Sequence, residues 1–234
     1  MRDKNLNPNK LDLAEEKKKL REMSFSEAVQ YIWMYFKIPI IAVFAVLAIG
    51  IFLTVRIATN IPDNWLMVTF SNTTVDAGTG SPLWEAFTDA AGYDLTEKKV
   101  EFNSVSYFDY LQNQARGNAY YNAFVTLADV GELDAITMEV DSLAALGQSG
   151  RLMDLNDPRC AAIKEKYADR FVYYTPPEDD EDFDGPIPVG IDISDSILVT
   201  EYHLYQDSCA IGIGAHSENL EEVEYFIDFV LGDG

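Results

Sequence analysis

The sequence predicts an α/β protein in which a single N-terminal apolar helix precedes one lobe with a largely parallel sheet flanked by helices. An uncharged run of 18 residues covers 38–55, and strand-like and helix-like patterns alternate from residue 65 to about residue 155. Crossover segments of this length are typical of parallel strands. The length of 234 residues leaves room for one ordinary domain besides the apolar helix.

The apolar run has the length of a membrane-spanning helix. At about 1.5 Å per residue it covers roughly 27 Å, close to the hydrocarbon thickness of a bilayer. A buried core helix would normally keep a polar stripe, and a cleavable signal peptide would have a shorter leader and a shorter apolar run. We therefore expect an uncleaved transmembrane helix at residues 38–58, with the lipid bilayer as its partner.

The charges on either side of this helix predict its orientation. Residues 1–37 contain eight Lys and Arg side chains, whereas residues 57–97 contain none. The positive-inside rule then places the N-terminus in the cytoplasm of a single-pass membrane protein. The expected organisation is a cytoplasmic tail with a juxtamembrane helix at 1–37, the transmembrane helix at 38–58, and an extracytoplasmic domain at 59–234.

Two local signals support separate juxtamembrane and spanning helices. Ser24 and Glu27 have the spacing of a capping box, which predicts a helix start. Pro39 suits the first turn of the spanning helix better than a helix interior.

The predicted external part is strongly acidic. Residues 57–234 contain eight basic and 33 acidic side chains, an excess of 25 negative charges. Such a domain repels nucleic acid and anionic lipid, so we expect no nucleic-acid partner. Cys160 and Cys209 both lie in this part, and the sequence leaves open whether they form a disulfide.

The external part begins with a strand, a helix and a second strand. Apolar residues predict a strand over 65–70. Ser81 is the expected N-cap of the following helix, Pro82 its first residue, and Gly92 marks its end. The second strand is predicted over 98–105.

The middle of the chain continues the alternation. Residues 106–130 have mixed helical spacing, and Gly117 and Asn118 predict a break between two helices. A third strand is predicted over 133–138, and a short helix over 141–149 follows it.

The remainder is expected to add strands and one closing helix. Strands are predicted over 170–176, 186–194, 196–205 and 209–215. The closing helix begins near Ser217 or Asn219, with Asn219 and Glu222 as its capping pattern. Its apolar residues recur at helical spacing on one face: Val223, Phe226, Ile227 and Val230.

Two segments carry a resemblance to a known family. The strand with Asp134-Ala-Ile, the helix with Leu143-Ala-Ala-Leu and the sequence Gly150-Arg-Leu-Met-Asp-Leu resemble the first lobe of the extracytoplasmic solute-binding proteins of ABC importers, the type II periplasmic-binding-protein family. The segment 215–232 resembles the closing helix of that family. The resemblance covers 65–155 and 208–232, and it implies a bound solute and an ABC permease as partner.

The chain departs from that family in two respects. Members usually have two lobes, whereas residues 156–207 are too few for a second one. Members are also usually secreted or lipid-anchored, whereas this chain has an expected transmembrane helix. The resemblance therefore implies an abridged, membrane-anchored, periplasmic-binding-protein-like lobe.

The expected ligand site follows from the strand order. In a parallel sheet, ligands bind at the loops that follow the carboxyl ends of the strands. These loops carry amide, hydroxyl and carboxylate groups, which suit a neutral or cationic polar solute: Asn72, Thr73, Thr74, Ser104, Tyr107, Glu139 and Asp141. The alternative is that such residues cap helices, with Ser81, Ser106 and Asp141 as N-caps.

An acidic loop offers a candidate metal site. Asp180, Asp182, Asp184 and Gly185 match positions 1, 3, 5 and 6 of a calcium loop, but Ile191 occupies position 12, where a bidentate carboxylate is needed. The sequence therefore leaves a Ca²⁺ loop and a merely solvated acidic loop as alternatives, and no other cofactor is expected.

The sequence supports two hypotheses for the function, and neither is enzymatic. The chain has two histidines and none of the common nucleophile, zinc-protease or phosphate-loop motifs, so we expect no enzyme. The leading hypothesis is a membrane-anchored extracytoplasmic domain that binds a polar neutral or cationic solute beside an ABC importer. The alternative is a ligand-free interaction module, stabilised by Ca²⁺ or not, that docks on a membrane partner through aromatic residues: Tyr107, Phe108, Tyr110, Tyr120, Tyr121 and Phe124.

Overall fold

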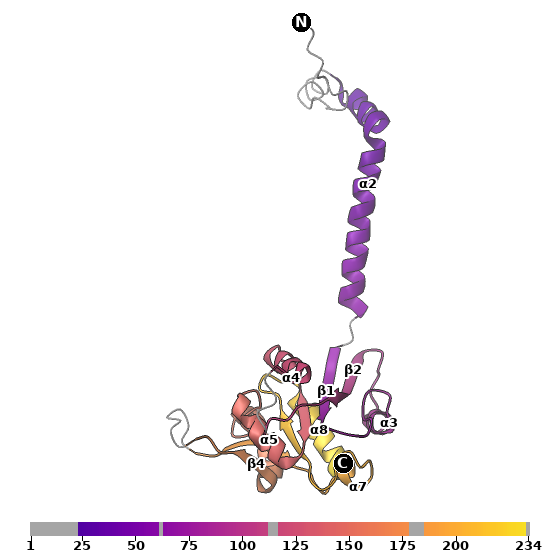
Figure 1. Cartoon of the computed structure of the whole chain (residues 1–234). Coiled ribbons are helices and arrows are strands. Elements are labelled where there is room, and N and C mark those ends of the chain that lie inside the picture. The colour runs from indigo at the N-terminus through magenta and orange to yellow at the C-terminus, as the bar shows by residue number, and fades with distance from the viewer. Residues whose placement is uncertain (1–22, 61–62, 112–116, 178–184, 233–234) are drawn as a thin grey trace. The chain divides into compact units, whose positions relative to one another are not determined.

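The computed structural model describes residues 23–60, 63–111, 117–177 and 185–232. The chain divides into two compact units, Met1–Ile61 and Pro62–Gly234 (Figure 1). The Asp180, Asp182 and Asp184 loop lies outside the described residues.

The described residues of the first unit form the helix α2, which spans Phe25–Asn60. The capping box at its start is present, because the Ser24 N–H and hydroxyl both donate to the Glu27 carboxylate, at 3.0 and 2.7 Å. Its segment Lys37–Arg56 is long and apolar enough to cross a membrane, by length and composition alone. Apolar side chains of this segment are exposed within the unit, including Phe44 and Val46.

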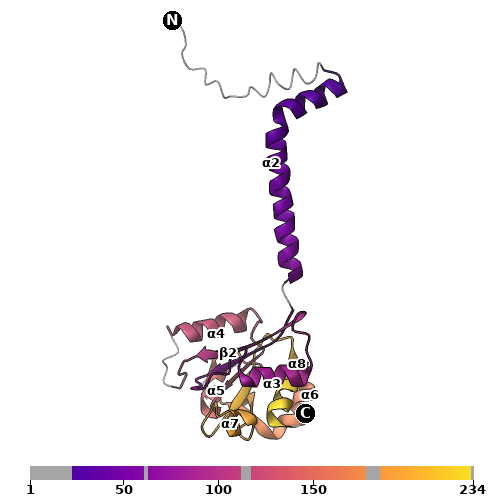
Figure 2. The ribbon, with the colours of Figure 1, turned by 90° about the vertical axis from the view of Figure 1, so that its right-hand side faces the viewer.

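The expected separation into two helices is wrong. α2 is continuous, and Pro39 lies inside it rather than in a first turn. A proline within a helix removes one main-chain hydrogen bond and pushes against the preceding turn, which bends a helix without always ending it. Figure 2 shows that α2 bends in its N-terminal part.

The second unit is built on a six-stranded mixed sheet with the order β2-β1-β3-β6-β5-β4. The strands are β1 (Asp63–Ser71), β2 (Lys98–Ser106), β3 (Ala135–Met138), β4 (Phe171–Tyr174), β5 (Ile187–Asp192) and β6 (Ala210–Ile213). β1 pairs in parallel with β2 and with β3. β6 is antiparallel to both of its neighbours, β3 and β5, and β4 is antiparallel to β5.

The α/β class is thus confirmed, whereas the expectation of a largely parallel sheet is wrong. Parallel neighbours need a crossover segment of a dozen or more residues, and α3 and α4 supply such segments only between β1, β2 and β3. Between β5 and β6 the only helix is the four-residue α7, Ile197–Thr200. The second half of the sheet is therefore joined by antiparallel pairing.

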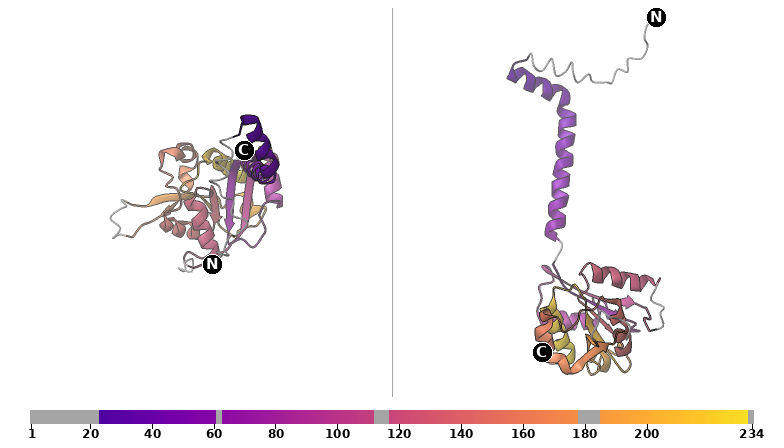
Figure 3. Two further views of the ribbon diagram at one scale, coloured as in Figure 1. Left: turned by 90° about the horizontal axis from the view of Figure 1, so that it is seen from above. Right: turned by 90° about the vertical axis from the view of Figure 1, so that its left-hand side faces the viewer.

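Helices cover both faces of the sheet, as Figure 1 and Figure 3 show. One face carries α3 (Pro82–Ala91), α6 (Ala161–Tyr167), α7 and α8 (Leu220–Leu231), which pack on a core that includes β1 and β2. The other face carries α4 (Ala119–Asp129) and α5 (Val140–Leu146) over β3, β4 and β5. Short 3₁₀ turns lie at Gly147–Ser149, Pro158–Cys160 and Ala168–Arg170.

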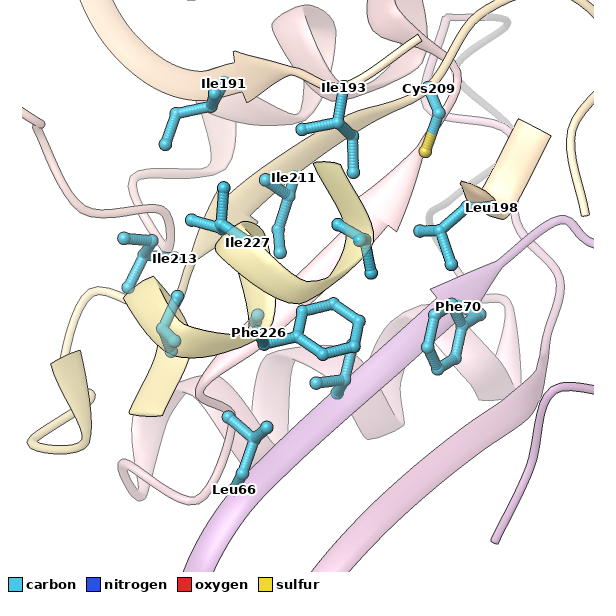
Figure 4. Close-up of a cluster of buried hydrophobic side chains, with 14 of the residues drawn as sticks. Leu66, Phe70, Ile191, Ile193, Leu198, Cys209, Ile211, Ile213, Phe226 and Ile227 are labelled. Atoms are coloured by element: carbon cyan, nitrogen blue, oxygen red, sulfur yellow. The ribbon is translucent and has the colours of Figure 1, made fainter. Parts of the chain in front are cut away.

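The closing helix α8 holds the larger core together. Figure 4 shows the Phe226 ring directed toward Phe70 of β1, and Ile227 on the side of Ile211 of β6. All four of the apolar positions predicted from helical spacing are buried. The predicted capping pattern is wrong, since Asn219 is the N-cap residue but makes no side-chain cap, and Glu222 instead accepts a hydrogen bond from the Trp65 indole.

The signals at both ends of α3 are confirmed. The Ser81 hydroxyl accepts the Trp84 N–H at 3.3 Å, and Pro82 is the first helical residue. Gly92 follows the helix in the left-handed conformation, with φ 64°.

Other predicted elements are wrong. Residues 107–111 form no helix, so among the described residues the segment 106–130 contains only α4, which begins after its N-cap Asn118. Ser106 ends β2 and caps no helix. Asp141 lies in the first turn of α5, whose N-cap position is held by Glu139.

The predicted strand over 196–205 is also absent. The Asp192 carboxylate accepts the N–H and the hydroxyl of Ser194, at 2.9 and 2.6 Å, and this turns the chain away from the sheet. The Ser196 carbonyl then accepts the N–H of Thr200 at 3.0 Å and starts α7.

The cysteines do not form a disulfide in the structure. Cys160 and Cys209 are both free and fully buried. Burial raises the pKa of both thiols, that of Cys209 well above its ordinary value.

Candidate functional site

The carboxyl ends of β1, β2 and β3 lie at one edge of the sheet. Ser71 of β1 is paired with Ser106 of β2, and Phe70 of β1 with Thr137 of β3. The loops that follow these strands line an open pocket of about 510 Å³. Its lining consists of Asn72, Tyr107, Phe108, Asp109, Leu111, Asn118, Glu139 and Ser142.

Asn72 fastens the first two loops together. Its side-chain Nδ2 donates to the Phe108 carbonyl at 2.9 Å, and its Oδ1 accepts the Phe108 N–H at 3.0 Å. Its main-chain N–H donates to the Ser106 carbonyl at 2.7 Å. Asn72 has a positive φ of 62°, a conformation that Asn tolerates better than most residues. Its amide therefore shapes the pocket wall.

Tyr107 gives the pocket an aromatic side. Its hydroxyl donates to the Thr73 carbonyl at 2.6 Å, and its ring meets the Tyr120 ring edge to face, with centroids 6.0 Å apart. Asn118 donates to the Tyr107 carbonyl at 2.8 Å and also caps α4. The Tyr107 ring, 44% exposed, is thus held from both sides.

The described residues that line the pocket include two carboxylates, and none of these described residues is basic. Glu139 precedes α5 in an extended conformation and is exposed. Among the described residues, the Glu139 carboxylate has no hydrogen-bond partner and no ion-pair partner. Asp109 contributes the second carboxylate. The described lining therefore has a formal charge of −2, from Glu139 and Asp109.

Tyr205 joins the strand ends beneath this edge. Its hydroxyl is buried and lies 2.9 Å from the Thr137 hydroxyl, 2.9 Å from the Thr137 carbonyl and 3.1 Å from the Ser71 carbonyl. Desolvation raises the pKa of Tyr205 well above its ordinary value. Tyr205 therefore stays neutral and bridges the ends of β1 and β3.

Three of the residues predicted from sequence meet in the pocket, namely Asn72, Tyr107 and Glu139. Thr73 is buried, and its hydroxyl donates to the Val75 carbonyl at 3.0 Å. Thr74 is exposed and does not line the pocket. Asp141 lines a neighbouring pocket instead.

Ser104 is not at this site. Its hydroxyl donates to the Asp76 carboxylate at 2.8 Å, beside a groove along the outer edge of β2. The Gly78 N–H and the Ser104 hydroxyl lower the pKa of Asp76. Ser104 therefore secures the loop that covers the sheet edge.

Sequence reasoning missed several residues around the pocket. Asp109 and Asn118 belong to a segment that the helical spacing assigned to two helices. Asn118 carried a usable signal, since Asn is a preferred N-cap and a helical pattern follows it. Tyr205 carried none, because its contacts lie 68 and 134 residues away in sequence.

The two other predicted features have different outcomes. The Asp180, Asp182 and Asp184 side chains lie outside the described residues, and in the described part of the chain no group of three acidic, His or Cys side chains is placed to hold a metal ion. Of the aromatic residues, Phe108 and Phe124 are buried and pack with Tyr121 as core. Tyr107 and Tyr120 remain half exposed.

Comparison of the chain with protein-family models, with curated proteins and with solved structures finds no match.

Proposed function

We propose that the second unit binds a small polar solute, neutral or cationic, in the pocket at the carboxyl ends of β1, β2 and β3. The observation that carries this proposal is the unpaired Glu139 carboxylate in a pocket of about 510 Å³. Ligand pockets of α/β proteins occur at this position of the sheet, and a few polar groups in a formed cavity are their usual lining.

The chemistry of the pocket favours a cation over an anion. An ammonium group gains a charge-assisted hydrogen bond from a carboxylate and an attraction to the face of a tyrosine ring. Glu139 offers the carboxylate and Tyr107 the ring. The acidic excess of residues 57–234 also raises the local concentration of cations.

The proposal places this unit outside the cell, beside an ABC importer, with residues 38–58 as its membrane anchor. The anchor is supported by the uncharged run, by the exposed apolar side chains of Lys37–Arg56 and by the basic residues that precede it. The importer is supported by the sequence resemblance of 65–155 and 208–232 alone.

Thermal unfolding of the full chain in lipid nanodiscs tests the proposal. The probes are sugars, amino acids, linear amines and divalent cations at millimolar concentration. A solute that binds the folded state raises the unfolding temperature. We expect such a rise with one class of polar solute, and we expect Glu139→Gln to remove it. Glu218→Gln, an exposed carboxylate outside the pocket, is the matched control.

Two outcomes would overturn solute binding at this site. One is the absence of a thermal shift with every probe. The other is a shift that Glu218→Gln reduces as much as Glu139→Gln does, which would indicate a general effect of the acidic surface.

The second candidate function is a ligand-free docking module for a membrane partner. The observation that favours it is a group of exposed apolar side chains near the pocket, which includes Tyr107, Leu111 and Tyr120. Co-purification of the full chain with a membrane protein, lost in Leu111→Ser and unaffected by solutes, would support this function. Loss of solute binding without loss of the partner would separate the two functions.

A further inference from the structure

We propose that the first part of α2, residues 25–36, lies along the surface of the membrane, with one apolar face in the interfacial layer of the phospholipid bilayer. This inference rests on the membrane anchor in the proposed function and adds a second lipid-binding element to it. The leaflet concerned is the one on the N-terminal side of the span, which the positive-inside rule identifies as cytoplasmic.

The helix α2 is longer than a membrane span requires. It contains 36 residues, which is about 54 Å of helix. Its apolar segment Lys37–Arg56 contains 20 residues and covers about 30 Å, the thickness of the hydrocarbon core. Residues 25–36 directly precede this segment in the same helix, so they start from the membrane surface. This remaining length, about 18 Å, must either project into water or lie along the bilayer.

Residues 25–36 have the pattern of a helix that lies at an interface. Apolar residues occur at positions 25, 28, 29, 32, 33 and 36, and spacings of three and four define one helix face. Phe25, Val29 and Trp33 of this face are 87%, 50% and 61% exposed. Glu27 and Gln30 lie on the opposite side of the helix, as does Met34. The apolar face is costly in water and favourable in the interfacial layer of a bilayer.

A bend in α2 allows residues 25–36 to leave the axis of the span. Figure 2 and the right panel of Figure 3 show the N-terminal part of α2 turned away from the rest of the helix. Pro39 lies inside the helix, at the third position of Lys37–Arg56. Its ring pushes against the carbonyl four residues earlier, and its nitrogen has no hydrogen to donate. The cause of the bend therefore lies at the boundary between the two parts of α2.

The residues at this boundary suit the headgroup layer. Trp33 and Lys37 are both exposed, and Trp and Lys are residue types that anchor a helix at the level of the headgroups. Residues 1–37 contain eight basic and six acidic side chains, so anionic lipid does not repel this end of the chain as it repels the acidic second unit.

Electron paramagnetic resonance of the full chain in nanodiscs of phosphatidylcholine and phosphatidylglycerol tests this inference. A nitroxide on one introduced cysteine reports its collisions with oxygen, which partitions into lipid, and with a nickel chelate, which stays in water. Cys160 and Cys209 are buried, and the wild-type chain, taken through the same labelling, measures any background from them.

Four exposed positions distinguish the two sides of the segment. Phe25→Cys and Val29→Cys place the label on the apolar face, and Gln30→Cys and Met34→Cys are the matched controls on the other side. We expect the labels at 25 and 29 to lose most of their collisions with the nickel chelate and to gain collisions with oxygen. The labels at 30 and 34 should keep their collisions with the chelate.

Phe44→Cys, at an exposed position within Lys37–Arg56, reports on the anchor itself. Its label should be shielded from the chelate and accessible to oxygen. If that label is instead in water, both the anchor and this inference fail.

Two results would overturn the in-plane helix and leave the anchor in place. One is a shielded label at 44 with labels at 25 and 29 that meet the chelate as often as those at 30 and 34, which would mean that the segment projects into water. The other is equal shielding at all four positions, which would mean that the segment is covered on every side. Solute binding by the second unit is measured separately, by thermal unfolding, and stands or falls independently of these results.

Discussion

At the scale of single residues, Asn72 combines a left-handed backbone conformation with two hydrogen bonds to the main chain of Phe108. We predict that Asn72→Ala lowers the free energy of unfolding by about 2–4 kcal/mol, since it adds left-handed strain to the loss of both bonds. Asn72→Gly loses only the bonds and should cost about 1–3 kcal/mol. Urea unfolding of the full chain measures both values.

The control for this prediction is Asn122→Ala, at an exposed position of α4 whose side chain has no hydrogen bond to a described residue. Asn122→Ala should change the free energy of unfolding only slightly. Equal destabilisation by Asn72→Ala and Asn72→Gly would show that the backbone conformation at residue 72 carries no strain.

Asp134 is a buried carboxylate at the start of β3, and it predicts a distinctive pH dependence. It accepts hydrogen bonds from the Met67 N–H, the Ser217 hydroxyl and the Asn219 amide, at 2.7, 2.7 and 3.1 Å. Desolvation nevertheless raises its pKa above the ordinary value of 3.8. Its contribution to stability is therefore complete below pH 3.8 and is lost as the pH rises through the raised pKa.

The predicted readout is the difference in unfolding free energy between the wild type and Asp134→Asn. This difference should shift against the wild type between pH 3.5 and pH 7, because only the wild type must keep a buried charge. Asp195→Asn should give the opposite trend, because hydrogen bonds from Arg170 lower the pKa of Asp195 and its contribution is lost as the pH falls. The same trend for both variants would contradict the opposite pKa shifts of Asp134 and Asp195.

At the scale of elements, the contact between α5 and β5 depends on a glycine. A Cβ at Gly190 would collide with Leu143 Cδ2 of α5 and lie 2.8 Å from the Ile211 carbonyl oxygen. We predict that Gly190→Ala lowers the free energy of unfolding by about 1–3 kcal/mol through overpacking. Chemical denaturation of the full chain, followed by circular dichroism, measures the effect.

Gly212→Ala is the graded comparison for this prediction. Its Cβ would lie 3.1–3.2 Å from methyl groups of Leu143 and Leu152, which can move by a few tenths of an ångström. The cost should therefore be smaller than at Gly190, where a carbonyl oxygen of the neighbouring strand blocks the space. An equal or larger loss of stability in Gly212→Ala would mean that the Leu143 and Leu152 side chains cannot move to make room for the added methyl group.

The elements that could be predicted are those whose local signals agree with their tertiary contacts. Ser81, Pro82 and Gly92 specify both ends of α3, and the apolar spacing of α8 coincides with its buried face. The prediction of a strand over 196–205 failed because an alternating apolar pattern does not exclude a short helix and turn. The prediction of a largely parallel sheet failed at β6 because the direction of a strand depends on partners that are far away in sequence.

The residues of the candidate site could likewise be predicted only where they directly follow a strand that the sequence identifies. Asn72 and Glu139 directly follow strands that the sequence identified, so the parallel register of β1 and β3 brings their loops to one edge. Ser104 precedes the end of β2 and faces the outer edge of the sheet, which no local pattern indicates. Asp109 and Asn118 depend on the path of the loop between β2 and α4, and that path is fixed by the bonds from Asn72 to Phe108.

At the scale of the whole molecule, the two native cysteines make the proposed membrane topology testable. Cys160 and Cys209 are fully buried, and burial raises the pKa of both thiols. A charged maleimide that cannot cross membranes reacts with exposed thiolates, so the folded wild type should not be labelled. A single introduced cysteine then reports the side of the membrane on which it lies.

We predict that Asp207→Cys, at an exposed position of the second unit, is labelled in intact cells or spheroplasts. Ser26→Cys, at an exposed position near the start of α2, should be labelled only after permeabilisation. This difference follows from the positive-inside bias of residues 1–37 and from an uncharged run that is long enough to separate two aqueous compartments. The reverse pattern would invert the topology. Labelling of both cysteines only after lysis would place the acidic unit inside the cell and remove the basis for a role beside an importer.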